Sequence, residues 1–198
     1  MRFSGREVRD LAVAWVALGL AFTFFLNARV LFALDRPGAL AAFGQGLALS
    51  LLTVGVGFLL HELAHKVVAV RFGQLAEFRA DYGMLLLAII GGLAGFLFAA
   101  PGAVHHRGRI TERENGLIAL AGPVTNVVLA VAFGALLLAG GFLGHVGSLG
   151  VSINVFLAGF NMIPFGPLDG RKVLDWNAAV FAAALVPTAG PALWLLFG

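Results

Sequence analysis

Long apolar runs separated by short polar stretches dominate the chain. A helix that crosses a membrane needs about 20 predominantly apolar residues. The chain is 60% hydrophobic and only 12% charged, against roughly 45–50% apolar and about 25% charged in an ordinary soluble domain. The sequence therefore predicts an all-α polytopic membrane protein with five to six transmembrane segments. The runs cover residues 11–34, 47–70, 84–104, 116–143, 147–168 and 176–198.

The third run, residues 84–104, decides on which side of the membrane the later loops lie. Lys and Arg collect in cytoplasmic loops. If 84–104 enters the membrane and returns to the same side, most of the 13 basic residues share the side of the N-terminus. If 84–104 spans the membrane, the basic residues are divided almost evenly between its two sides. We therefore expect a re-entrant segment at 84–104 and a cytoplasmic N-terminus in a multi-pass protein of the cell membrane.

The polar residues exclude several other classes of protein. The absence of cysteine rules out disulfide scaffolds, thiol catalysis and Cys-ligated zinc. The net charge is only +3 and the basic residues are scattered through short loops, which indicates membrane topology signals and no nucleic-acid partner. The longest polar stretch, residues 105–114, is too short to separate two domains. We therefore expect a single membrane-embedded domain over residues 1–198.

Residues 61–65 read His-Glu-Leu-Ala-His and carry the strongest chemical signal. On a helix, His61 and His65 lie one turn apart on the same face and can bind one metal ion. Glu62 lies beside them, where it can act as a general base, as in zinc proteases with an HExxH motif. Ionisable residues inside a spanning helix are costly and usually functional. The alternative is a polar cluster that only packs helices together.

Asp169 is the candidate for the third ligand that a catalytic zinc usually has. It ends the fifth apolar run, and Pro164 and Pro167 stop a regular helix before it, so a turn can present its carboxylate. His61 and Asp169 both lie near the C-terminal ends of their apolar runs. They lie at the same depth in the membrane only if the two runs cross it in the same direction. A re-entrant 84–104 segment satisfies this condition. The alternative is a loop Asp that caps the next element.

Three motifs resemble those of the site-2 protease family of intramembrane zinc metalloproteases. HELAH matches the HExxH of the family, and Ala121-Gly122-Pro123-Val-Thr-Asn126 is similar to its Gly-x-x-x-Asn pattern. Asn161-x-x-Pro164 followed by Leu168-Asp169-Gly170 resembles the motif that supplies the carboxylate ligand. The resemblance covers roughly residues 47–175, the expected catalytic core, and is to the short, archaeal-like form without a PDZ domain. It implies one zinc ion per chain, a three-helix core and cleavage of transmembrane protein substrates.

The resemblance and the residues together predict a mechanism. Glu62 activates a zinc-bound water, which attacks a peptide bond within or near a transmembrane helix of the substrate. Such a helix must unwind locally, and its freed backbone groups then need partners. Asn161 and Asn126 are the candidate substrate-binding residues, because an amide both donates and accepts hydrogen bonds; interhelical hydrogen bonding is the alternative for both. Residues 98–104 are a candidate edge for strand addition.

Two rival functions are consistent with the same residues. One is a non-catalytic membrane protein that binds a partner helix or stores metal, although storage does not explain Glu62. The other is a small ion transporter that uses His61, His65 and Asp169 as a relay, although the chain shows no inverted repeat. A further set of polar residues is expected to lie in solvated loops. They are His105, His106 and His145, and the group Glu77, Arg79 and Asp81.

Overall fold

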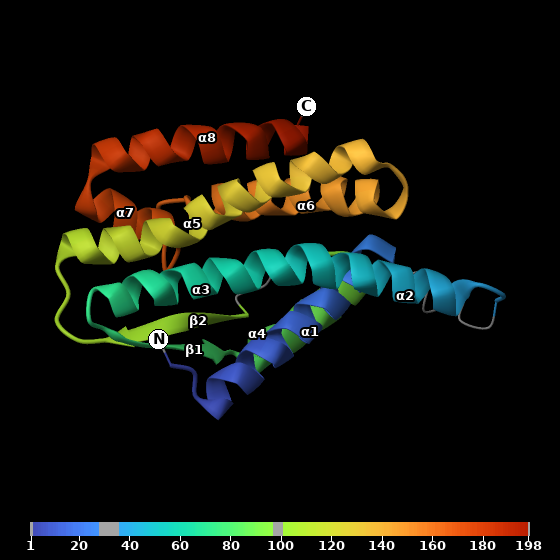
Figure 1. Cartoon of the computed structure of the whole chain (residues 1–198), viewed down its shortest axis with the longest axis horizontal. Helices are drawn as coiled ribbons and strands as arrows, with labels where there is room; N and C mark the ends of the chain where they lie inside the picture. Colours follow the sequence, from blue (N-terminus) through green and yellow to red (C-terminus); the bar gives the residue numbers. More distant parts are fainter. Residues whose placement is uncertain (1, 28–35, 97–100, 198) are drawn as a thin grey trace. The chain divides into compact units, whose positions relative to one another are not determined.

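The computed structural model describes residues 2–27, 36–96 and 101–197, and for residues 191–197 it describes the backbone alone. Helices make up most of the described chain (Figure 1). The far end of the first predicted span, and residues 98–100 of the predicted substrate edge, lie outside the described residues. The helices are α1 (Gly5–Asn27), α2 (Ala39–Ser50), α3 (Val56–Arg71), α4 (Tyr82–Ala94), α5 (Glu112–Gly134), α6 (Gly141–Asn161), α7 (Asp169–Trp176) and α8 (Ala178–Phe197).

Three shorter elements complete the fold. A five-residue π-helical segment, η2 (Leu51–Gly55), joins α2 and α3 into one continuous helix, and η3 (Ala135–Ala139) extends α5 by a 3-10 turn. Two strands, β1 (Leu75–Ala80) and β2 (Gly102–Arg107), pair in a two-stranded sheet. π-helical turns are often found near functional sites, and η2 immediately precedes the helix that carries the HELAH motif.

The prediction of an all-α polytopic membrane protein is confirmed. Among the described residues, four helices are long and apolar enough to cross a membrane, and they are Gly5–Asn27, Ala39–Arg71, Glu112–Ala139 and Gly141–Asn161. Two further apolar helices are shorter, Tyr82–Ala94 and Ala178–Gly190. At 1.5 Å per residue the 13 residues of α4 extend only about 20 Å, less than the roughly 30 Å of a hydrocarbon core. This length favours a re-entrant third run.

The described chain divides into two compact units. Unit 2 comprises Arg2–Val56 and Phe78–Ala103, and in it α1 packs against α4 and α2. Two buried acidic residues of α1 are bonded within this unit: Glu7 accepts from the backbone N–H of Phe78 at 3.0 Å, and Asp10 accepts from the Tyr82 hydroxyl at 2.7 Å.

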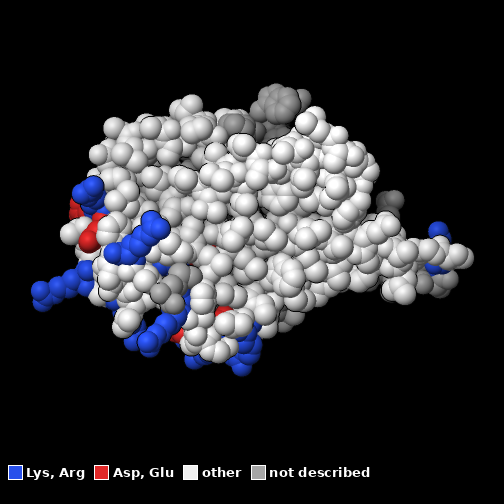
Figure 2. Space-filling view, viewed as in Figure 1, with Lys and Arg blue, Asp and Glu red and all other residues white. Residues whose placement is uncertain are grey.

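Unit 1 comprises Gly57–Glu77 and Val104–Gly198 and contains all of the candidate site residues. In it α5 packs against α6 and α7, and α8 packs against α6 and α7. A core of Ala119, Met162 and Val173 joins α5 to α7 and to the loop that precedes α7. On the face drawn in Figure 2, Lys, Arg, Asp and Glu gather over the end where α5 begins and α7 lies, whereas the surface along the rest of α5 shows none of them. This distribution suits helices surrounded by lipid.

Several local predictions are wrong. The first helix begins at Gly5 and not at residue 11, because buried partners accommodate its polar residues. The segment of Glu77 and Arg79, predicted to be a solvated loop, is strand β1, in which Phe78 is fully buried. Two of the histidines assigned to loops lie in β2, and His145 lies on an exposed face of α6.

Candidate active site

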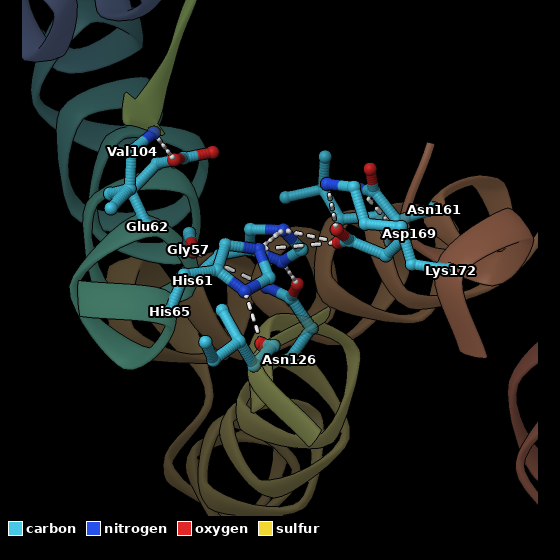
Figure 3. Close-up of polar contacts among 11 residues, drawn as sticks. Gly57, His61, Glu62, His65, Val104, Asn126, Asn161, Asp169 and Lys172 are labelled. Carbon is cyan, nitrogen blue, oxygen red and sulfur yellow. Dashed lines mark hydrogen bonds and ion pairs between the residues drawn. The ribbon is translucent and has the colours of Figure 1, made fainter. Parts of the chain in front are cut away.

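Helix α3 carries the HELAH motif, and its two histidines converge as the i, i+4 spacing predicts. The rings of His61 and His65 lie edge to face with centroids 4.6 Å apart, and their Nε2 atoms are 3.0 Å apart (Figure 3). Both side chains are buried. The two Nε2 atoms therefore face one point in the interior of unit 1.

The other ring nitrogens are held by α5. His65 Nδ1 lies 2.7 Å from the carbonyl oxygen of Ile118, and His61 Nδ1 lies 2.6 Å from the side-chain oxygen of Asn126. A carbonyl oxygen can only accept, so the proton of neutral His65 is on Nδ1 and its Nε2 carries the lone pair. Hydrogen bonds of this kind commonly orient histidines that bind metals.

Asp169 completes the cluster from the first residue of α7. Its Oδ2 lies 3.3 Å from His61 Nε2 and 3.2 Å from His65 Nε2, while its Oδ1 lies 3.7 Å from the ammonium of Lys172. Burial alone would raise the pKa of Asp169, whereas the rings of His65 and His61, when they are protonated, lower it below its ordinary value. The structure thus brings together three side chains that lie up to 108 positions apart in the sequence.

The three facing atoms fit a zinc ion. Ligands about 2.0–2.1 Å from a tetrahedral zinc lie roughly 3.3–3.4 Å from one another, and the three distances here are 3.0, 3.2 and 3.3 Å. Two imidazole nitrogens and one carboxylate oxygen are a donor set that zinc accepts. The three side chains could therefore hold a metal ion.

Gly122 on α5 provides the room for this arrangement. A Cβ atom at this position would lie 2.5 Å from both Cε1 and Nε2 of His61 and 2.6 Å from Cε1 of His65. Gly122 lies one helical turn before Asn126, on the same face. The Gly-x-x-x-Asn spacing therefore places an open position against the two rings and an amide against His61 Nδ1.

Glu62 is buried beside the cluster and is bonded to the sheet. Its Oε2 accepts a hydrogen bond of 3.1 Å from the backbone N–H of Val104 in β2. Figure 3 shows this carboxylate on the side of the histidines away from Asp169. A buried carboxylate next to a metal site, with its second oxygen uncommitted by this bond, is suited to accept and return a proton.

The two asparagines proposed to bind substrate have different environments. Asn126 is fully buried, and its amide bonds to His61, to the carbonyl of Gly57 and to Asn154. These bonds weigh against substrate binding by Asn126 and favour the interhelical alternative. Asn161 is half-buried at the end of α6, where its Nδ2 donates to the carbonyl of Leu157 at 2.9 Å.

Sequence reasoning missed several groups around the site. Asn154 is a polar residue inside an apolar spanning segment, and its position alone is a signal that it has a specific partner. Lys172 follows Asp169 by three residues on α7, so the i, i+3 spacing could have found it. The backbone groups of Ile118 and Val104 leave no signal in the sequence.

Comparison with known proteins decides the family. A protein of Methanocaldococcus jannaschii named "Putative zinc metalloprotease MJ0611" is 42% identical to this chain over 201 residues, which is 99% of this chain and 97% of that protein. The chain belongs to the site-2 protease family of zinc metalloproteases. "Putative zinc metalloprotease YwhC" of Bacillus subtilis is 33% identical over 147 residues, covering 63% of this chain and 66% of that protein.

A longer protein matches the chain over part of its length. "Putative zinc metalloprotease Rip3" of Mycobacterium tuberculosis is 34% identical over 137 residues, which is 66% of this chain but 30% of that protein. No family model and no solved structure matches the chain significantly. Family membership together with the apolar helices makes this chain a membrane-associated metalloprotease that acts on a protein substrate.

Proposed function

We propose that the chain is an intramembrane zinc metalloendopeptidase that cleaves within or near transmembrane helices of membrane-protein substrates. His61, His65 and Asp169 are its metal ligands, and each chain holds one zinc ion. The observation that supports this proposal most directly is the convergence of two imidazole nitrogens and one carboxylate oxygen at mutual distances of 3.0–3.3 Å. The donor groups lie on α3, which belongs to a candidate membrane span, and on α7, which follows another.

The residues of the chain divide the chemical work. Zinc, when bound, lowers the pKa of a water ligand toward about 7 and polarises a carbonyl group. Glu62 receives the proton of the attacking water and delivers it to the leaving amine, so that one peptide bond and one water become a carboxylic acid and an amine. The bond from Val104 N–H to Oε2 orients this carboxylate before substrate arrives.

The substrate enters as a locally unwound segment. A transmembrane helix hides its peptide bonds in internal hydrogen bonds, and every backbone group freed by unwinding needs a new partner. Strand β2 lies beside Glu62 and offers backbone groups to an extended chain. Asn161 supplies a half-buried amide at the end of α6, on the side of the site that holds Asp169 (Figure 3).

The placement in the membrane follows from the same proposal. The chain is one metalloprotease domain, with its catalytic core at about residues 47–175, in a multi-pass protein of the cell membrane. The N-terminus and the end of the molecule that holds the active site are cytoplasmic, because that side then carries most of the basic residues. A protease-accessibility assay on oriented vesicles tests this sidedness.

Replacing Glu62 by Gln tests the function. The amide keeps the size of the side chain but cannot accept the proton, so we expect zinc binding to persist and cleavage of a transmembrane reporter to be lost. Glu112→Gln, at the exposed start of α5, is the matched control and should retain both properties. Undiminished cleavage by Glu62→Gln would remove the proposed base. Metal flux into proteoliposomes that persists in Glu62→Gln would favour the transporter alternative.

A further inference from the structure

Two fully buried asparagines on neighbouring helices form a chain of hydrogen bonds that ends at the metal site. Asn154 on α6 donates from Nδ2 to the carbonyl of Gly150 at 2.8 Å. Its Oδ1 accepts from Nδ2 of Asn126 at 2.8 Å, and Asn126 Oδ1 faces His61 Nδ1 at 2.6 Å. Asn154 has no role in the proposed reaction, and yet burying its amide in a spanning helix is costly.

The direction of every bond in this chain is fixed at its far end. The carbonyl of Gly150 can only accept, so Asn154 must present its NH2 group there and its oxygen to Asn126. Asn126 must then donate to that oxygen and present its own oxygen to His61. A second carbonyl imposes the same orientation, because Asn126 Nδ2 also donates to Gly57 O at 3.3 Å.

The orientation of Asn126 fixes the tautomer of His61. An oxygen facing Nδ1 requires the proton of the neutral ring to be on Nδ1, which leaves the lone pair on Nε2. With Asn126 turned over, an NH2 group would face Nδ1 and the proton would move to Nε2. That proton would point at Asp169 Oδ2, 3.3 Å away, and would occupy the direction in which the ring binds metal.

We propose that Asn154 is a positioning residue that acts through Asn126 to hold His61 in the tautomer that binds metal. The inference rests on the proposed function, because it assigns a use to the Nε2 lone pair. Close packing supports it: a Cβ atom on Gly57 would lie 2.9 Å from Asn154 Oδ1, so α3 and α6 approach closely where the amides meet. Without Asn154, only the 3.3 Å bond to Gly57 would orient Asn126.

Three substitutions on α6 separate this role from a general effect on folding. Asn154→Leu removes both hydrogen bonds, whereas Asn154→Asp in its neutral form still accepts from Asn126 and donates to Gly150. Ser152→Ala is the matched control, because half-buried Ser152 also bonds to the carbonyl four residues earlier, but this bond is exposed. We expect Asn154→Leu to raise the zinc dissociation constant about 10- to 100-fold. Asn154→Asp and Ser152→Ala should stay close to wild type.

The experiment measures zinc affinity by chelator competition on the full chain in detergent, together with 15N NMR of the ring nitrogens after zinc removal. The chain has five histidines, so a His61→Gln variant assigns the signals of His61. We expect the wild type to hold the proton on Nδ1 and Asn154→Leu to show a mixture of tautomers. A wild-type His61 protonated on Nε2 would overturn the inference, even if Asn154→Leu failed to fold. So would an unchanged tautomer and zinc affinity in that variant.

The same data distinguish failure of this inference from failure of the proposed function. A wild type that shows the predicted tautomer but binds no zinc would contradict the metalloprotease site and leave the hydrogen-bond chain intact. A wild type that binds zinc, with Asn154→Leu indistinguishable from it in both readouts, would contradict only the role of Asn154.

Discussion

Replacing Gly122 by Ala is predicted to disable the metal site while leaving the fold intact. The added Cβ would lie 2.5 Å from His61 Nε2, where a non-bonded contact needs roughly 3.5 Å, so the ring must retreat by about 1 Å. Metal sites tolerate only about 0.2 Å in ligand distance. A misplacement of about 1 Å can cost about 100-fold in rate. Overpacking costs about 1–3 kcal/mol of folding free energy, and a better helix propensity than that of Gly returns up to about 1 kcal/mol.

The assay compares Gly122→Ala with a second glycine of α5. A Cβ on Gly134 would lie 3.9 Å from Cγ2 of Val151, an ordinary contact, so Gly134→Ala should bind zinc and cleave like wild type. We expect Gly122→Ala to fold, with a helical circular-dichroism spectrum, but to bind zinc at least tenfold more weakly and to lose about 99% of its proteolytic rate. Wild-type zinc affinity and cleavage in Gly122→Ala would refute the packing argument.

Two further predictions concern charged side chains. Lys172→Met removes the cation beside Asp169 Oδ1 and should weaken zinc binding about tenfold in chelator competition, whereas Lys172→Arg and the exposed Arg171→Met should not; equal affinities in all four proteins would exclude this role. Tyr82→Phe removes the 2.7 Å hydrogen bond to buried Asp10 and should cost about 2 kcal/mol, lowering Tm by about 4–8 °C in thermal unfolding. An unchanged Tm would show that the bond contributes nothing.

The sequence predicts that His61, His65 and Asp169 come together, because the features that bring them together are the spacing on one helix and the direction of the membrane segments. The spacing of His61 and His65 fixes their common face on any helix. Asp169 lies far along the chain, but the number of membrane crossings between it and the motif decides whether the residues can meet. The 13 residues of α4 extend only about 20 Å, which is shorter than a hydrocarbon core and favours that expectation.

The sequence does not predict features that depend on backbone groups far away along the chain. Strand β1 forms because it pairs with β2 and buries Phe78, although its alternating charges are typical of a loop. The start of α1 was missed for a similar reason, since Glu7 is polar in sequence but satisfied by a backbone N–H more than 70 positions away. The carbonyl of Ile118, which orients His65, is common to every residue type and leaves no pattern.

The zinc-to-protein ratio of the purified chain, measured by elemental analysis beside Asp169→Ala, tests the central claim most directly. Asp175→Ala, an exposed aspartate on the same helix, is the control. We predict one zinc per chain in the wild type and in Asp175→Ala, and almost none in Asp169→Ala. The same zinc content in Asp169→Ala as in the wild type would contradict the account, because the carboxylate that joins the two histidines would then play no part in holding the metal.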